Sequence, residues 1–307
     1  MNHREVPRPG IGAEISDAEQ LEGFTHLSAD ADGIRIHAVV GGSTGSDPVV
    51  LLAGFPQTWY AWHKVMPALA RHHRVIALDL PGQGLSDRPA DGYDTETAAA
   101  RVHEAVVRLA GGRYWLFAHD IGSWVAFTYA LRYADELAGL ALLDAGIPGV
   151  TLPETLPLNP AGAWKMWHFA FHQVPDLPEV LLEGKEREYV SWFLRAKTAT
   201  GNVFDGAEID LYTKALIRDG GLHAAMEYYR AVPESAARNR RLLADRELTM
   251  PVLAIDSEHG SIPDMAAPLT PFVPHVRRAS IAGAGHFIPD EQPAALAQIL
   301  LRFANAL

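Results

Sequence analysis

Alternating apolar and polar positions open the chain, and continuously apolar runs follow them. Residues 33–41 alternate in the manner of an antiparallel strand, and residues 24–29 can pair with them through a turn at Asp32-Gly33. We therefore predict a hairpin at the start of a sheet. Continuously apolar runs are typical of strands that are buried on both faces. Such runs occur at residues 48–53, 74–80, 114–118 and 137–143.

Amphipathic segments with helical periodicity separate these runs. They cover residues 62–71, 95–109 and 123–133. Alternation of buried strands with amphipathic helices is typical of an α/β protein whose doubly wound sheet is mostly parallel. We predict that fold class. The alternation stops at Pro148 and resumes later in the chain, with apolar runs at 251–255 and 276–281 and a closing helix at 291–306.

The interruption predicts an inserted helical cap. Between residues 147 and 246 there is no strand-like run, and the helical segments are rich in aromatic residues. We predict three parts, which are a first core segment (1–146), a helical cap (147–246) and a second core segment (247–307). No internal repeat is found in the sequence.

Composition and charge narrow the classes of function. The formal net charge of −11, without a basic stripe, makes nucleic acids and anionic membranes poor partners. The absence of cysteine excludes a thiol nucleophile and a Cys-ligated zinc site. Residues 1–10 lack an apolar signal segment, and no apolar run approaches the roughly 18 residues of a membrane span. We expect a cytoplasmic protein that acts on a small neutral molecule, and we leave open whether it forms a homodimer.

Asp120 stands where an apolar strand is expected to end and a helix to begin. Ala118 and Gly122, two positions before and after it, are the small residues that a nucleophile elbow needs for close packing of strand and helix. A carboxylate at this turn attacks a saturated carbon, displaces oxygen or halide, and leaves an ester on the protein. Asp120 is therefore the candidate nucleophile. The structural alternative is an aspartate that caps the helix.

His286 lies in a glycine turn after the last predicted strand and is the candidate general base. An imidazole with a pKa of about 6.5 accepts a proton from water at neutral pH. Asp144 ends the next predicted strand after Asp120, one strand-helix-strand step along the chain. We favour Asp144 as the acid that orients the imidazole. The usual position of this acid, after the next strand, is Gly260 in this chain, and Asp256 is the alternative.

Two backbone amides are the candidate oxyanion hole. Phe55 follows the apolar run at 48–53, and Ile121 follows the nucleophile, so their N–H groups are expected to stabilise the charge that develops during ester hydrolysis. In the cap, His168 and Tyr229 offer proton donors on otherwise apolar helical surfaces. We expect them to hold the departing oxygen, although either residue alone is commonly a satisfied core group.

With these residues assembled, the chain resembles the α/β-hydrolase superfamily, and within it the Cif-type epoxide hydrolases, over nearly its whole length. The matching motifs are Phe55-Pro56-Gln57-Thr58-Trp59-Tyr60, Ala118-His119-Asp120-Ile121-Gly122, Trp167-His168-Phe169, Gly184-Lys185-Glu186-Arg187 and Glu227-Tyr228-Tyr229-Arg230-Ala231.

The resemblance implies that Asp120 is the nucleophile, that an acid at Asp144 orients the base, and that His286 is this base. It also implies His168 and Tyr229 as a ring-opening pair, which is unusual because most epoxide hydrolases use two tyrosines. The substrate is then a small epoxide, and no metal or organic cofactor is needed.

The aromatic cap favours an apolar or aromatic epoxide. Its candidate contacts are Trp59, Trp124 and Trp167.

Two positions depart from the family pattern. The oxyanion loop normally begins with His-Gly, and here it begins with Ala53-Gly54, which removes a side chain that could brace the loop. Cif-type enzymes carry Glu as the acid, and this chain has the shorter Asp144. His286 must therefore approach Asp144 more closely or lean on another acid.

Two other functions stay open. Haloalkane dehalogenases share the aspartate nucleophile but usually place Trp after it, where this chain has Ile121. Haloacetate dehalogenases bind the substrate carboxylate with arginines just after the nucleophile, and Ile121 and Ser123 supply none. A non-catalytic ligand-binding protein on the same scaffold is compatible with Ala53, whereas the intact nucleophile, acid and histidine argue against it.

Overall fold

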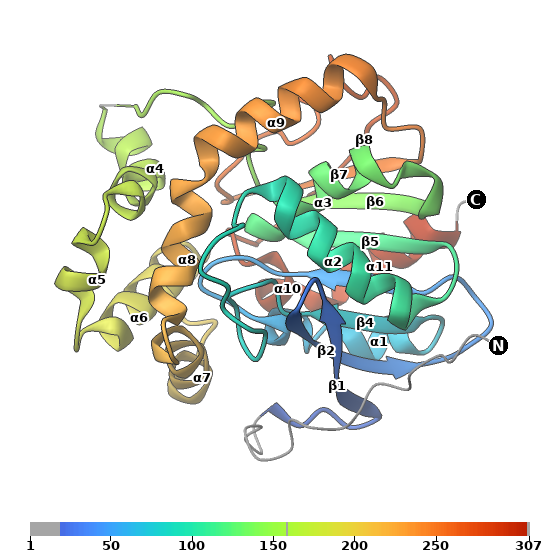
Figure 1. Ribbon diagram of the computed structural model, residues 1–307, viewed down its shortest axis with the longest axis horizontal. Helices are drawn as coiled ribbons and strands as arrows, with labels where there is room; N and C mark the ends of the chain where they lie inside the picture. The colour runs from blue at the N-terminus through green and yellow to red at the C-terminus, as the bar shows by residue number, and fades with distance from the viewer. Residues whose placement is uncertain (1–18, 158, 306–307) are drawn as a thin grey trace.

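One eight-stranded sheet forms the centre of the protein, in the order β1-β2-β4-β3-β5-β6-β7-β8 (Figure 1). The computed structural model describes residues 19–157 and 159–305. The strands are β1 (Phe24–Ala31), β2 (Ile34–Gly42), β3 (Val49–Leu52), β4 (Arg74–Leu78), β5 (Tyr114–His119), β6 (Leu137–Leu143), β7 (Val252–Ser257) and β8 (Arg277–Ile281). β1 and β2 form the predicted antiparallel hairpin, and β2 also pairs antiparallel with β4. All other neighbouring strands are parallel.

Helices cover both faces of the sheet, as the fold class requires. Alternate residues of β3 belong to two separate apolar clusters, because successive side chains of a strand point to opposite faces. One cluster includes residues of α2 (Thr95–Ala110) and α3 (Ile121–Arg132). The other includes residues of the short α1 (Met66–Ala70), α10 (Ile288–Glu291) and α11 (Pro293–Asn305). The continuously apolar strands are therefore buried on both sides.

Two predicted helices are wrong in extent, and proline explains both differences. The segment at 62–71 forms a 3-10 turn, η2 (Trp59–Trp62), and then the five-residue α1, whose first turn contains Pro67. The closing segment is divided into α10 and α11, and α11 begins at Pro293. Proline lacks an N–H and fits the first turn of a helix better than its interior. The last predicted helical residue, Ala306, lies outside the described residues.

A helical insertion lies between β6 and β7, as predicted. Its described elements are all helices. All but the last lie together at the left of Figure 1, and the last runs from them across the top of the view. The helices are α4 (Pro160–Gln173), α5 (Leu177–Leu182), α6 (Glu186–Ala196), α7 (Gly206–Ile217), α8 (Gly221–Arg230) and α9 (Val232–Asp245).

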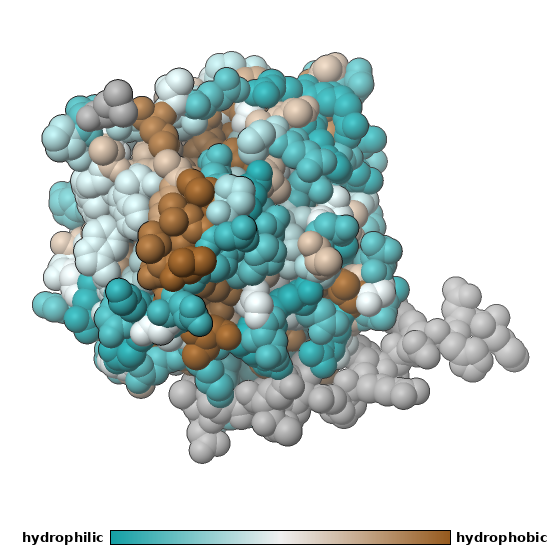
Figure 2. Space-filling model, turned by 60° about the vertical axis from the view of Figure 1, so that its left-hand side comes forward, coloured by the Kyte–Doolittle hydropathy of each residue, from teal (hydrophilic) through white to brown (hydrophobic). Residues whose placement is uncertain are grey.

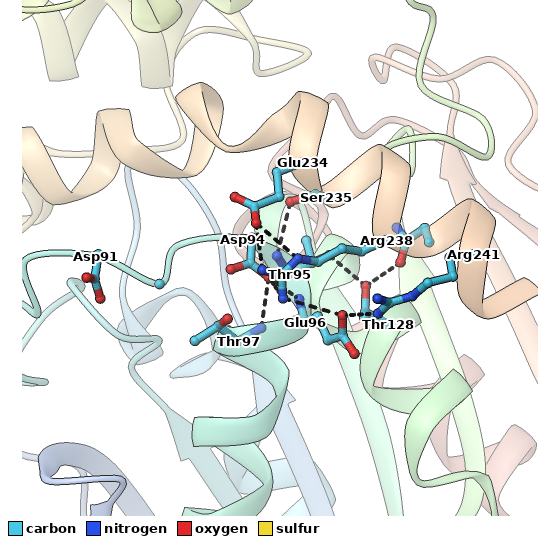
Figure 3. Close-up of polar contacts among 12 residues, drawn as sticks. Asp91, Asp94, Thr95, Glu96, Thr97, Thr128, Glu234, Ser235, Arg238 and Arg241 are labelled. Carbon is cyan, nitrogen blue, oxygen red and sulfur yellow. Dashed lines mark hydrogen bonds and ion pairs between the residues drawn. The ribbon is translucent and has the colours of Figure 1, made fainter.

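Helix α9 is tied to the core helix α2 by a group of ion pairs (Figure 3). Arg238 contacts Asp94 at 3.1 Å and Glu96 at 3.4 Å, and Arg241 contacts Glu96 at 2.6 Å. Asp94 also caps α2 by accepting hydrogen bonds from its first turn. Because only Ala231 separates α8 from α9, the ion pairs between α9 and α2 also fix α8 relative to the core.

The outer face of the inserted helices exposes apolar side chains. Val180 and Leu181 of α5 are 68% and 53% exposed, and Figure 2 shows apolar residues gathered on this side of the molecule. Exposed patches of this kind occur at interaction surfaces. Of the helices that the structure describes, none has the length and hydropathy to cross a membrane.

Candidate active site

The parallel strands bring two carboxylates to one edge of the sheet. β5 ends directly before Asp120, and its neighbour β6 ends directly before Asp144. Since the carboxyl ends of parallel strands meet at the same edge, the two residues emerge side by side, at the edge where open α/β sheets bind their ligands. Both have positive φ angles, 54° for Asp120 and 40° for Asp144, which are uncommon for residues other than glycine. Strained backbone of this kind clusters at functional sites.

Asp120 occupies the tight turn between β5 and α3 that the sequence predicts. A Cβ atom at Gly122 would lie 2.7 Å from the carbonyl oxygen of Leu52, so only glycine allows α3 to approach β3 this closely. Most residues of this region are fully buried, but the Asp120 side chain keeps 17% exposure. The nucleophile candidate is therefore less enclosed than its neighbours.

Of the two amides chosen from the sequence, that of Phe55 bonds to this carboxylate and that of Ile121 lies next to it in the chain. The N–H of Phe55 donates to Oδ1 of Asp120 at 2.8 Å, and the N–H of Ile121 is among the groups that lower the pKa of this carboxylate. Gly54 makes this possible, because a Cβ atom there would lie 2.2 Å from Oδ1. One oxygen of Asp120 thus already occupies the position in which an ester carbonyl would be stabilised.

His286 lies between Asp120 and Asp144. Its Nδ1 donates to Oδ2 of Asp144 at 2.7 Å, and its Nε2 is 3.4 Å from Oδ2 of Asp120. Asp144 also accepts hydrogen bonds from the backbone N–H groups of Ser261, at 2.8 Å, and Ile262, at 2.9 Å. The shorter acid therefore reaches the imidazole directly, without help from a second carboxylate.

Asp256, the alternative acid, lies elsewhere in the structure. It pairs with both Nε and Nη2 of Arg278, at 2.7 and 3.0 Å, and accepts a hydrogen bond from the N–H of Met265. Its carboxylate is thus engaged with β8, and the structure brings Asp144 to the histidine.

Burial and hydrogen bonding determine the charges of Asp120 and His286. Burial alone would raise the pKa of Asp120, but the hydrogen bond from His286 and its charge outweigh burial and lower that pKa to about 2. Burial alone would lower the pKa of His286, but hydrogen bonds to Asp120 and Asp144 outweigh it and raise that pKa. Asp120 is therefore anionic at neutral pH, as a nucleophile requires.

The inserted helices place His168 and Tyr229 in one aromatic cluster, which also contains Phe55. Their ring centroids are 5.8 Å apart, and the Tyr229 ring is 5.9 Å from that of Phe55. Burial, followed by the charge of Asp120, raises the pKa of Tyr229 well above 10, so its phenol keeps its proton. Burial, followed by Lys197, lowers the pKa of His168 far below 6.5. Both side chains are therefore neutral hydrogen-bond donors at pH 7.

A third donor, His172, was not predicted from the sequence. Its ring centroid is 4.4 Å from that of Tyr229 and 5.0 Å from that of Phe55. Its Nε2 bonds with the hydroxyl of Tyr189, while its Nδ1 has no partner among the described residues. The sequence could have indicated His172, because it lies four residues after His168 and residues four apart lie on the same face of a helix.

Two further residues position the base and were also missed. The buried Nε2 of His119 donates to the backbone oxygen of His286 at 2.8 Å. Glu291 accepts hydrogen bonds from the N–H groups of Gly285 at 2.8 Å and Phe287 at 3.0 Å, on either side of the histidine. His119 adjoins the nucleophile in the sequence, whereas nothing local in the sequence distinguishes Glu291.

Of the three tryptophans predicted to contact substrate, the structure brings one to the site. The Trp124 ring lies 5.6 Å from that of Tyr229. Trp59 belongs to the apolar cluster on the other face of the sheet and contacts the ring of His26 at 5.3 Å. Trp167 packs between α4 and α6, 5.5 Å from Trp192. Within the ranges described, no group of three His, Asp or Glu residues has an arrangement that could hold a metal ion.

Comparison of the sequence with known proteins gives a family and two kinds of enzyme. The family described as alpha/beta hydrolase fold matches residues 47–293. The chain is 32% identical over 290 residues to the soluble epoxide hydrolase of Corynebacterium sp. (strain C12), which covers 91% of this chain and 97% of that protein. It is 30% identical over 295 residues to the fluoroacetate dehalogenase of Burkholderia sp., which covers 93% of this chain and 95% of that protein.

Solved structures agree with this assignment. Wild-type Cfl2 from Burkholderia cenocepacia superposes with a TM-score of 0.90 at 54% identity, covering 92% of this chain and 96% of that one. The Cif epoxide hydrolase from Acinetobacter nosocomialis superposes with a TM-score of 0.86 at 25% identity, covering 92% and 90% of the two chains.

Proposed function

The chain belongs to the α/β-hydrolase fold family, as an enzyme of the epoxide hydrolase or dehalogenase type, and we propose that it is an epoxide hydrolase. In this proposal, Asp120 opens the epoxide and becomes esterified, and water activated by His286 releases a vicinal diol. Residues 147–246 act as the cap, and residues 1–146 and 247–307 form the core. The observation that carries the proposal is the anionic Asp120 beside His286, with two neutral donors, Tyr229 and His168, in the aromatic cluster that contains Phe55, whose N–H bonds to Asp120.

In the first step, Oδ2 of Asp120 attacks one epoxide carbon. The bond between this carbon and the ring oxygen breaks, and its electron pair stays on the oxygen, which remains attached to the neighbouring carbon. Tyr229 protonates this oxygen while His168 donates a hydrogen bond to it. Neutral donors suit this task, because a cation at their position would pair with Asp120 and weaken its attack.

In the second step, His286 removes a proton from water, and the hydroxide attacks the carbonyl carbon of the ester. The amides of Phe55 and Ile121 stabilise the oxyanion, and the protonated His286 returns its proton to the departing alcohol. Asp120 is released as an acid, and its proton restores the phenol of Tyr229. Because the ester carries no charge, its formation removes one of the carboxylates that raise the pKa of His286 and so favours the basic form.

Dehalogenation is the second candidate, because it uses the same ester and because the fluoroacetate dehalogenase of Burkholderia sp. is 30% identical to this chain. The residues after the nucleophile disfavour it. Ile121 stands where a halide-binding tryptophan is usual, and neither Ile121 nor Ser123 supplies a guanidinium. A protein that binds a small ligand without turnover is the third candidate, against which the contacts of His286 with both carboxylates argue.

Single turnover in water enriched in heavy oxygen tests the proposed mechanism. With enzyme in excess over styrene oxide, one heavy oxygen should enter the peptide that contains Asp120, and the first diol should carry none. Heavy oxygen in the diol of the first cycle, with an unlabelled peptide, would contradict the ester.

A panel of epoxides, haloacetates and alkyl halides separates the candidate functions. We expect diol from an aromatic epoxide, no halide release, and neither product with Asp120→Asn. Halide without diol would favour the dehalogenase. Saturable binding of the panel compounds without either product would favour the non-catalytic protein.

A further inference from the structure

Lys197 stands beside the catalytic base, held by the backbone. Its carbonyl oxygen accepts a hydrogen bond from the N–H of His286 at 2.8 Å. Two residues later, the N–H of Ala199 donates to the carboxylate of Glu291 at 2.7 Å. The same carboxylate accepts a hydrogen bond from Gly285, next to His286. The position of Lys197, directly after α6, is therefore fixed by the contacts that fix the base.

The side chain of Lys197 is largely buried, and its ammonium group has no anionic partner among the described residues. The residue is 8% exposed, and its Nζ lies 4.7 Å from the ring centroid of Phe193. Across the described ranges, no carboxylate forms an ion pair with this Nζ and no acceptor forms a hydrogen bond with it. A buried ammonium group is costly unless it is paired. An ammonium group in a largely buried side chain, without a paired carboxylate, is therefore available to an anionic ligand.

The charge persists at neutral pH and acts on the site. Burial lowers the pKa of Lys197 to about 8, while the charges of Asp120 and Asp144 oppose that effect. The group is thus mostly protonated at pH 7. After burial, its charge is the next cause that lowers the pKa of both His168 and His172. The ammonium is therefore within electrostatic reach of the nucleophile, the acid and two of the donors.

Lys197 lines a cavity of about 200 Å³ between the inserted helices and residues 259–261, which follow β7. Lys165 and Trp164 of α4 form one side, and Ser261 forms part of the other. The cavity adjoins Asp144 and His286, because Ser261 contacts both. The N–H of Ser261 donates to Asp144, and the Oγ of Ser261 is 3.4 Å from Nδ1 of His286.

The lining of this cavity is cationic in a chain with a net charge of −11. Two lysines contribute to it, and none of the described lining residues is acidic. Nζ of Lys165 donates to the backbone oxygen of Gly260 at 3.1 Å. The cavity therefore offers one ammonium that is already engaged with backbone and one that has no acceptor.

We propose that this cavity binds a substrate carboxylate through Lys197, so that the enzyme acts on epoxides that carry a carboxylate group. The substrate class rests on the proposed function, whereas the carboxylate site stands on Lys197 and the cavity. One unpaired ammonium matches the single charge of a carboxylate, and the aromatic residues of the cap contact the apolar part of the molecule. The ion pair also offsets the repulsion between a second carboxylate and Asp120.

Binding of unreactive ligands tests the site independently of catalysis. Phenylacetate and its neutral analogue phenylacetamide are compared by calorimetry with the wild type, Lys197→Met and Lys214→Met. Lys214 is an exposed lysine of α7, so its variant controls for the loss of one charge. We expect wild type and Lys214→Met to prefer the acid by about tenfold, and Lys197→Met to show no preference. Lys197→Arg should retain part of it.

Equal binding of acid and amide by the wild type, a comparison that needs no variant, would overturn the carboxylate site. A preference that survives in a folded Lys197→Met protein would overturn it as well. Lys197→Gln provides the same comparison if the methionine variant does not fold.

Kinetics with paired epoxides separates this inference from the proposed function. The ratio of kcat/KM for 4-carboxystyrene oxide to that for 4-carbamoylstyrene oxide should exceed unity in the wild type and fall in Lys197→Met. Diol from both epoxides at equal efficiency, without acid preference in binding, would overturn the inference and leave the epoxide hydrolase standing. Acid preference in binding, with diol from neither epoxide, would overturn the epoxide hydrolase and leave the carboxylate site standing.

Discussion

A Cβ atom on Gly260 would lie 2.7 Å from Oδ1 of Asp144. The position at which an acid is usual is therefore a glycine because the carboxylate arrives from the end of β6 and fills the space. Ser261 and Ile262, the next two residues, hold that carboxylate by their N–H groups. The glycine at position 260 and the acid at position 144 therefore depend on each other.

Gly260→Ala should displace Asp144 from His286, because the new methyl group and the carboxylate cannot occupy the same space. We expect kcat for epoxide hydrolysis to fall by about tenfold or more. Gly112→Ala is the matched control, since a Cβ atom there meets nothing within 4 Å. Equal kcat for the two variants would show that Asp144 does not need its present position.

His286→Gln should stop the reaction after the first step. The variant keeps Asp120 but lacks the base, so incubation with styrene oxide should add the mass of the epoxide to the protein. Intact mass spectrometry measures the adduct, and Asp120→Asn should show none. An unmodified mass for His286→Gln would count against the covalent ester.

Tyr229→Phe should slow formation of the ester by about tenfold or more, because it removes one donor that faces the developing alkoxide. Single-turnover kinetics measures this step. Tyr228→Phe is a control on the same helix, since its hydroxyl donates instead to the backbone oxygen of Pro81. Equal single-turnover rates for Tyr229→Phe and the wild type would remove Tyr229 from the mechanism.

Asp120→Asn should lower the pKa of His286. Burial lowers this pKa, and the hydrogen bonds and charges of Asp120 and Asp144 raise it above 6.5, so neutralising Asp120 removes one of the raising causes. NMR titration of the imidazole measures the change. By the same reasoning, hydrolysis of the ester should become faster as the pH rises and His286 becomes neutral. A pKa of His286 that is unchanged in Asp120→Asn would contradict the observed contact.

Asp290 should make stability depend on pH near neutrality. Burial raises its pKa to about 7, against the opposing effect of Lys64. In the unfolded chain this carboxyl ionises near pH 4, so its contribution to stability is complete below that pH and is lost as the pH rises to about 7. Relative to wild type, Asp290→Asn should therefore gain stability across this window.

Urea unfolding at several pH values between 5 and 8 measures this difference in the free energy of unfolding. Asp210→Asn, at an exposed position of α7, provides the control. A constant difference between Asp290→Asn and the wild type over this range would contradict the raised pKa.

Much of this arrangement follows from patterns that are local in the sequence. The runs that form β5 and β6 are continuously apolar because these strands are buried on both faces. The alternation at residues 33–41 predicts β2, although residues 36–40 of this strand are buried on both faces in the structure. The elbow at Asp120 is equally local, since it needs only small residues two positions away on either side. Short-range periodicity and turn chemistry therefore determine the fold class, the helical insertion and the candidate nucleophile.

The tertiary structure decided which groups meet across long separations. His286 and Asp144 are 142 residues apart, and the choice between Asp144 and Asp256 depends on Arg278, which pairs with Asp256 on the neighbouring strand. Trp59 belongs to a matching motif, yet the path of its loop packs it on the other face of the sheet. The unpaired charge of Lys197 depends on which atoms surround it. Such contacts act over a few ångströms in space, and only the packed chain brings these atoms together.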